Sequence, residues 1–214
     1  MRFAVSLRNC SLGLATASFL FTGVAWASPA ASTLSTTQQN VRPWNLVGVD
    51  AQLDQALDAS SAHRGQAIEA RLAREAKTAD GVDLPRGTQL VGEIDRVQAS
   101  TNGGPSIVSL VFTEAELKDG RTIPVKVTVI GAYPADEAQL AVNGAQTMPP
   151  APKHISYKER VDQEPGMLSH VSMHSAVQNS NSAIFRDNRG NLKLRAGTFL
   201  QVGIAPKTGA ASRG

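Results

Sequence analysis

Two alternating runs joined by an Asp-Gly turn constrain this chain most strongly. Because successive side chains of a strand point to opposite faces, alternation predicts a strand with one buried face. Ile107–Thr113 and Thr122–Ile130 both alternate, and Asp-Gly within Lys118–Arg121 is typical of a tight hairpin between them. The apolar face of each run consists of alternate residues: Val108, Leu110 and Phe112 in the first, and Ile123, Val125, Val127 and Val129 in the second. The chain therefore contains a hairpin that buries one face.

Further strands are predicted on both sides of this hairpin. Gln89–Val97 precedes it, with Gly92 allowing a bulge or close packing, and Ser182–Arg186 and Leu192–Ile204 follow it. Pro124 lacks a ladder donor, which predicts an edge or bulge position.

Two earlier segments fit more than one period. Val49–Leu57 alternates as a strand would, but Val49, Leu53 and Leu57 also match a helix. Ala67–Ala79 is rich in helix formers, yet Ile68, Ala70 and Leu72 alternate. From periodicity alone, strand and helix both remain open for these segments.

One turn sequence occurs twice. Leu84–Leu90 and Leu194–Leu200 both read Leu-x-x-Gly-Thr-x-Leu and lead into an apolar run. One echo is not a repeat architecture, but it predicts that the same tight turn feeds a strand twice in one β-fold.

Residues 1–27 have the parts of a secretory signal peptide. Arg2 and Arg8 form a positive start, Leu12–Val24 is apolar, and Ala25–Ala27 supplies small residues for cleavage. The alternative is an uncleaved membrane anchor, for which the apolar run is short. We expect export to the periplasm or beyond, and no transmembrane span in the mature chain.

Export changes the meaning of the charge. The net charge is +3, and loss of Arg2 and Arg8 removes two of these charges. It also removes Cys10, the chain's one cysteine, which excludes disulfides and multi-cysteine metal sites from the mature chain. Aromatic residues are only 5%, which argues against a base-stacking surface. No nucleic-acid partner is predicted.

The domain organisation follows from composition. After the signal peptide come a flexible leader (28–44), one β-domain (45–205) and a soft tail (206–214). Within the domain, an excursion over 132–181 breaks the alternation and is rich in proline. We predict an all-β fold, a mostly antiparallel barrel or sandwich of about seven to nine strands with one long Pro-rich loop.

Few residues carry catalytic potential. His170 and His174 have the spacing of a helical metal pair, but their segment lacks helix character and a third ligand. Ser169 adjoins His170 without the Gly-x-Ser-x-Gly elbow of a hydrolase. We interpret the histidines as solvated loop residues and predict no catalytic residue, metal or cofactor; a hydrolase using His170 or His174 is the weakest function considered.

Charged and glycine-rich motifs also read as surface features. Asp50, Asp54 and Asp58 recur every four residues and are interpreted as a solvated face rather than a cation site. Gly103–Pro105 is interpreted as a loop, not a phosphate cradle. Basic residues of the excursion alternate with acidic ones and form no basic stripe: Lys153, Lys158 and Arg160 alongside Glu159 and Asp162.

The order of these motifs resembles two groups of proteins. The motifs are Gly65–Ala70, Asp80–Ile94, Val111–Phe112, Leu117–Val125 and Leu194–Leu200. In this order they resemble small secreted β-rich bacterial proteins of uncharacterised function. More distantly, they are similar to the C-terminal β-barrel domain of TrbI-type proteins of type IV secretion (conjugation) channels. The resemblance implies a barrel in the cell envelope, and strands at Ile68–Leu72 and Val49–Leu57.

The chain departs from the channel proteins in three ways. Its leader looks cleavable, it has no long stalk, and the excursion is too polar and Pro-broken to span lipid. The leading expectation is an exported, non-catalytic envelope module that binds another envelope protein or a surface. The alternatives are a barrel that binds a small apolar ligand and a channel-like component.

Overall fold

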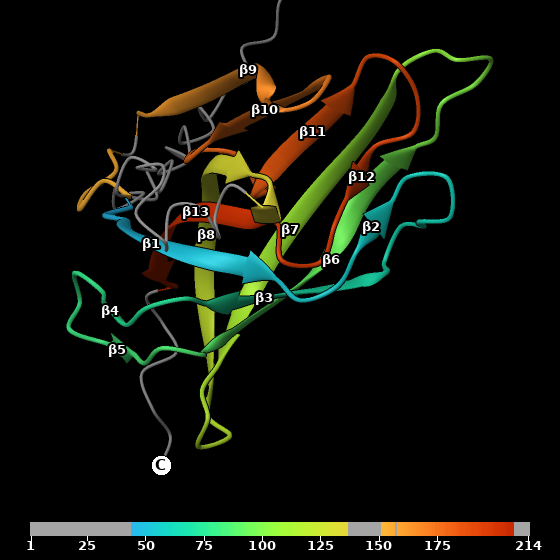
Figure 1. The fold of residues 1–214 in the computed structure, drawn as a ribbon. Coiled ribbons are helices and arrows are strands. Elements are labelled where there is room, and N and C mark those ends of the chain that lie inside the picture. The colour runs from blue at the N-terminus through green and yellow to red at the C-terminus, as the bar shows by residue number, and fades with distance from the viewer. Residues whose placement is uncertain (1–43, 137–150, 157, 208–214) are drawn as a thin grey trace, which may run out of the picture. The chain divides into compact units, whose positions relative to one another are not determined.

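The computed structural model describes residues 44–136, 151–156 and 158–207, and its elements are β-strands (Figure 1). The predicted signal peptide, most of the leader, part of the excursion and most of the tail lie outside these residues. In chain order the strands are β1 (Val47–Leu53), β2 (Leu57–Asp58), β3 (Ala67–Leu72), β4 (Ala76–Lys77), β5 (Asp83–Leu84), β6 (Gln89–Gln98), β7 (Ser106–Glu116), β8 (Thr122–Tyr133), β9 (Arg160–Leu168), β10 (Val171–Ala176), β11 (Ala183–Asp187), β12 (Lys193–Leu194) and β13 (Phe199–Pro206).

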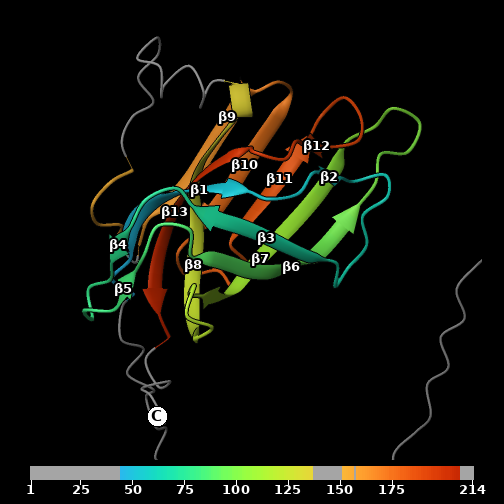
Figure 2. The same cartoon turned by 60° about the horizontal axis from the view of Figure 1, so that its bottom comes forward.

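Six strands close into an antiparallel barrel. Their order is β6-β3-β1-β13-β8-β7, and β7 pairs back with β6. From β7 the same sheet continues outward through β11, β10 and β9, which gives nine strands in all (Figure 2). Two short pairs, β2–β12 and β4–β5, stand apart from it. The predicted all-β, mostly antiparallel fold is confirmed, and of the two predicted architectures, barrel or sandwich, the structure has the barrel.

Alternating residues fill the barrel interior, as the sequence predicted. The largest fully buried side chains of the core are Phe112, Phe185, Leu53, Ile68, Leu72, Leu84, Leu90, Ile94, Leu110 and Leu192. The predicted hairpin joins β7 to β8: the N–H of Leu117 donates to the carbonyl of Arg121 (2.9 Å), and Gly120 has a φ of 83°. Burial of this apolar surface is the main force that holds the barrel together.

Both ambiguous segments are strands. β1 pairs with β13 and β3, and β3 pairs with β6, so backbone groups on both sides are satisfied in the sheet. Ile68, Ala70 and Leu72 are buried on one face of β3. A helix over Ala67–Ala79 would not place these three residues together, and sheet pairing overrides the local helix propensity.

The repeated turn has the same geometry at both positions. The N–H and hydroxyl of Thr88 donate to the Pro85 carbonyl (3.0 and 2.8 Å), and those of Thr198 donate to the Arg195 carbonyl (3.0 and 2.7 Å). The glycine before each threonine has a left-handed φ, 84° at Gly87 and 80° at Gly197. Glycine adopts this conformation without steric cost. The prediction of one turn used twice is confirmed.

The similarity extends beyond the turn. In each copy the turn is bonded to a buried leucine that ends a neighbouring strand, Leu72 of β3 in one and Leu53 of β1 in the other. Each turn is preceded by a two-residue strand, β5 or β12, and followed by a long strand, β6 or β13. Both long strands carry a register shift at equivalent places, Val91/Gly92 and Gln201/Val202. The strand pairs β3–β6 and β1–β13 thus share one local plan, including the turn that leads into the second strand of each pair.

The excursion is more regular than the sequence predicted. Its described part contains the β9–β10 hairpin, in which Gln163 pairs with Met173 and Leu168 with Val171. The register shifts between these two pairs, and Pro165 lies in that irregular stretch. A bulge tolerates proline because the ladder is interrupted there. The prediction of a long Pro-rich loop therefore missed the hairpin that this segment contains.

A strap formed by residues 151–156 crosses the outside of the barrel. The N–H of Ile155 donates to the carbonyl of Leu46 (3.0 Å), and both side chains are buried. They form a small second apolar cluster with Val177 and Ala205. A Cβ on Gly48 of β1 would collide with the carbonyl of Pro152, so the strap fits only because this residue is glycine.

We predict that Gly48→Ala destabilises the protein by about 1–3 kcal/mol, because strap and barrel wall must separate. The free energy of unfolding from urea titration measures the loss. Gly190→Ala is the matched control, since a Cβ there meets no atom within 4 Å. Equal stability of the two variants would contradict the role given to the strap.

Candidate functional site

Strands β7 and β8 separate at Pro124. Their ladder has three residue pairs and ends with Glu114 opposite Pro124. Beyond that point the first half of β7 (Ser106–Leu110) pairs with β11 instead. Pro124 occupies the last paired position, in agreement with the prediction of an edge or bulge, and the divergence leaves one edge of β8 facing the β9–β11 extension. We call this contact between β8 and the extension the seam.

Ser182 ties the two separated strands together. Its N–H donates to the carbonyl of Leu110 (2.7 Å), and its hydroxyl oxygen accepts from the N–H of Phe112 (3.0 Å). Its own carbonyl accepts from the N–H of Val129 on β8 (2.9 Å). One buried serine thus bridges β7 and β8 where no ladder joins them.

Side chains complete the seam in place of a neighbouring strand. The side-chain amide of Gln163 accepts from the N–H of Ala132 (2.9 Å) and donates to its carbonyl (2.8 Å). A glutamine amide has the same donor and acceptor as a peptide group, so Gln163 imitates one step of a ladder. The hydroxyl of Ser175 donates to the Val129 carbonyl. The edge of β8 is therefore closed to other strands along this stretch.

Lys126 is a buried cation in the seam. It is 7% exposed, and its ammonium donates to the carbonyls of Asn179 and Asn181. Burial, with a smaller contribution from the charge of Lys207, lowers the pKa of Lys126 to about 8. Within the part of the chain that the structure describes, no carboxylate pairs with it.

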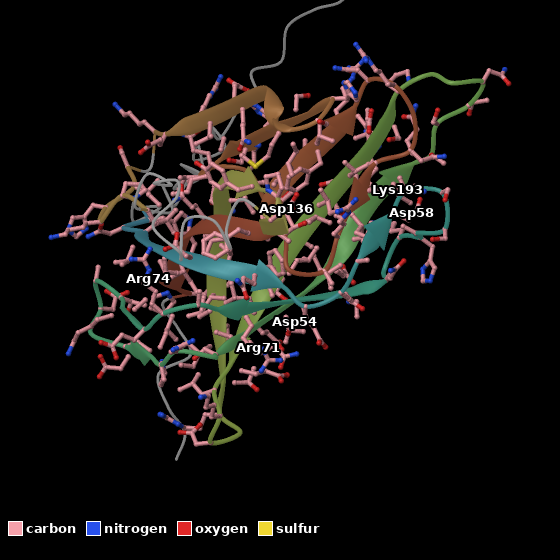
Figure 3. The ribbon with its side chains drawn as sticks, in the orientation of Figure 1. Asp54, Asp58, Arg71, Arg74, Asp136 and Lys193 are labelled. Atoms are coloured by element: carbon pink, nitrogen blue, oxygen red, sulfur yellow. The ribbon has the colours of Figure 1, made fainter. Side chains whose placement is uncertain are left out.

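The three recurring aspartates have three different partners. Figure 3 labels two of the pairs, those of Asp54 and Asp58. Asp54 pairs with Arg71 (3.0 Å) and Asp58 with Lys193 (3.3 Å), and both pairs lie near the surface. The Ser60 hydroxyl and N–H, with Lys193, lower the pKa of Asp58. Asp50 lies in β1, Asp54 directly follows that strand and Asp58 ends β2, so the three form no common helix face.

Asp50 differs from the solvated residue that the sequence indicated. It is only 2% exposed and pairs with Arg74, whose side chain is largely exposed. It lies opposite Gln201 of β13, whose side-chain oxygen accepts from the Tyr133 hydroxyl (3.5 Å). A buried carboxylate with a single cation is costly to separate from that cation. Asp50 therefore holds the β4 region against the wall of the barrel.

The two histidines do not converge. His170 follows Ser169 in the β9–β10 turn and has a φ of 64°. His174 lies in β10, where its Nδ1 contacts the carboxylate of Asp162 across the ladder. Four residues of strand span about 13 Å, so the helical spacing that would bring the two rings together is absent. Among the described residues, no group of three or more His, Cys, Asp or Glu is placed to hold a metal ion.

The other motifs also fall in turns and at the surface. Gly103–Pro105 lies in the β6–β7 loop, where the N–H of Gly104 donates to the Thr101 carbonyl (3.0 Å). Lys153, Lys158 and Arg160 are exposed. Within the described ranges no helix is long and apolar enough to cross a membrane.

An exposed sheet face was not identified from the sequence. Ile107 and Val111 of β7 and Ile184 of β11 point away from the core and are half-buried. Exposed charged residues border them: Glu93, Arg96, Asp162, His174 and Arg186. We call this group the outer face. The sequence did contain a sign of this face. Within Ile107–Val111, apolar residues occur at odd-numbered as well as even-numbered positions, whereas a strand with one solvated face needs them at only one of the two.

Comparisons with known proteins do not add a family. The chain matches no protein-family model, and a search of curated proteins finds no match.

We predict that Gln163→Leu destabilises the protein by about 1–3 kcal/mol, because the N–H and carbonyl of Ala132 lose their partner. Hydrogen exchange at the Ala132 amide should accelerate in the variant. Gln178→Leu, at an exposed position of the nearby loop, is the control and should leave that amide protected. Equal exchange rates in the two variants would show that Gln163 does not close the seam.

We predict that the stability of the protein depends on pH because Lys126 is buried. Its folded pKa of about 8 lies below the unfolded value near 10.5, so the unfolded state binds the extra proton between these pH values. Its contribution therefore raises stability as pH increases through this window, by an amount on the order of 3 kcal/mol. Urea unfolding at pH values across the window measures it.

The matched variants separate this residue from other lysines. Lys126→Met should remove the rise, whereas Lys193→Met, at a largely exposed lysine, should retain it. A rise that persists in Lys126→Met would assign it to another group.

Proposed function

We propose that this chain is an exported, non-catalytic module of the cell envelope that binds another envelope protein through the outer face. Export is supported by the signal-peptide pattern of residues 1–27. The outer face is the observation that carries the docking role, because its aliphatic centre and charged rim have the composition of a protein-binding patch.

The filled interior favours docking over a ligand-binding barrel. Phe112, Phe185, Leu90 and Ile94 occupy the core and are at most 2% exposed. A lumen that holds a small apolar molecule needs volume that these side chains already take. An outer surface is therefore better suited to binding than the barrel interior.

Strands β9–β11 widen the sheet but are not part of the closed barrel. The barrel is closed by six strands, and β11, β10 and β9 lie beyond that ring. Strands β7 and β11 carry the aliphatic centre of the outer face, so the extension widens the surface on which a partner would rest. A channel-like component is less well supported, because Arg160 and Asp162 are exposed on β9 and would face lipid at high cost.

The proposal predicts that Ile184→Arg abolishes partner capture without unfolding the barrel. The substitution places a charge at the centre of the outer face, where a docked partner would exclude water. Proximity labelling in the native envelope, with the chain fused to the labelling enzyme, measures which proteins lie against it.

Gln52→Arg is the control, since it adds the same charge at an exposed position of β1 outside the outer face. The expected result is a labelled envelope protein that is lost in Ile184→Arg and retained in Gln52→Arg. An unchanged labelling pattern in Ile184→Arg would contradict docking at this face.

A further inference from the structure

Among the described strands, β9 is the last of the nine-stranded sheet and has one edge without a ladder. Its only ladder partner among the described strands is β10. The carbonyl of Glu159 accepts from the N–H of Val177. The backbone N–H and carbonyl groups of odd-numbered residues in this stretch therefore point toward β10. Antiparallel strands alternate in this respect, so the N–H and carbonyl groups of Arg160 and Asp162 point to the open edge.

The side chains of β9 divide in the same way. Val161 packs against the hydrophobic core, and Gln163 bonds to Ala132 of β8. Arg160 and Asp162 lie on the other face and are exposed. The edge thus presents an acid and a base two residues apart, beside the backbone groups that another strand would use.

We propose that β9 pairs with β9 of a second copy of this chain, antiparallel and centred on Val161. This register places Arg160 of each copy directly opposite Asp162 of the other, so two opposite-charge pairs form about the two-fold axis. The backbone groups of the same two residues supply the hydrogen bonds of the new ladder. The edge is therefore complementary to itself.

The competing registers are less favourable. Centring the pair on Asp162 sets this carboxylate opposite itself, and centring it on Arg160 does the same for the guanidinium. Registers shifted by one residue would oppose an inward-facing position to an outward-facing one. The irregular stretch around Pro165 ends the regular edge and limits it to one short segment. The result is a closed two-fold dimer rather than a growing sheet.

The contact is small, so the dimer is expected to be weak and concentration-dependent. Sedimentation velocity on the purified wild-type protein over about a hundredfold range of concentration tests it. Wild type should shift from monomer toward dimer as concentration rises, and less so at high salt, which screens exposed pairs. A wild type that remains monomeric throughout would overturn the proposal.

Charge reversals make the test specific to this register. Arg160→Asp and Asp162→Arg each create two like-charge pairs and should weaken dimerisation about tenfold or more. The double variant Arg160→Asp/Asp162→Arg restores both pairs and should dimerise again. Single variants that dimerise like wild type would refute the centre on Val161.

Mixing the two single variants gives a further check. One carries two acids and the other two bases at these positions, so the mixture should form a heterodimer although each alone is monomeric. Matching thermal unfolding midpoints would show that both variants are folded. A mixture that remains monomeric would refute the predicted pairing.

Discussion

The structure depends on the division of β7 between three neighbouring strands. Along its length β7 pairs with β6, near its end with β8, and over its first half with β11. The pairing with β6 and β8 closes the barrel, and the pairing with β11 extends the sheet beyond it. Pro124 lies at the point of separation, opposite Glu114, and its carbonyl accepts from the N–H of Lys207 just beyond β13 (2.8 Å). The N–H that proline lacks would therefore face β13 rather than β7. Both the barrel and its extension follow from this single divergence.

The divergence has a cost that the seam offsets. An edge of β8 left unpaired in the interior would carry unsatisfied backbone groups. Ser182, Gln163 and Ser175 supply the missing hydrogen bonds from side chains and a loop. Because the interior is then packed and the edge of β8 is used, both proposals place partners on surfaces outside the barrel, the outer face and the edge of β9.

Local signals explain why much of the barrel could be predicted. The Asp-Gly hairpin turn and the two Gly-Thr turns form because glycine adopts a left-handed φ and because nearby residues, three positions apart, hydrogen-bond to each other. These turns can therefore be predicted from a short stretch of sequence. The seam was not predictable in this way. Gln163 bonds to a residue 31 positions away and Ser182 to one 70 positions away, and neither lies in a recognisable motif. The prediction of a solvated Asp50 was wrong because its burial depends on distant residues, Arg74 and the strand β13.

By itself, the sequence determined the β7–β8 hairpin, most of the barrel strands and the repeated turn, because periodicity and φ preference are local properties. The export signal of residues 1–27 remains a prediction from the sequence. Only the tertiary structure decided which strands are neighbours, where β7 and β8 part, that the Pro-rich excursion contains a hairpin, and which side chains close the seam. Those outcomes depend on pairing between distant segments, and backbone hydrogen bonding is nearly indifferent to which strand supplies the partner. Packing of the whole barrel selects the arrangement, and among the described residues that selection leaves the half-buried Ile184 and the edge of β9 at the surface.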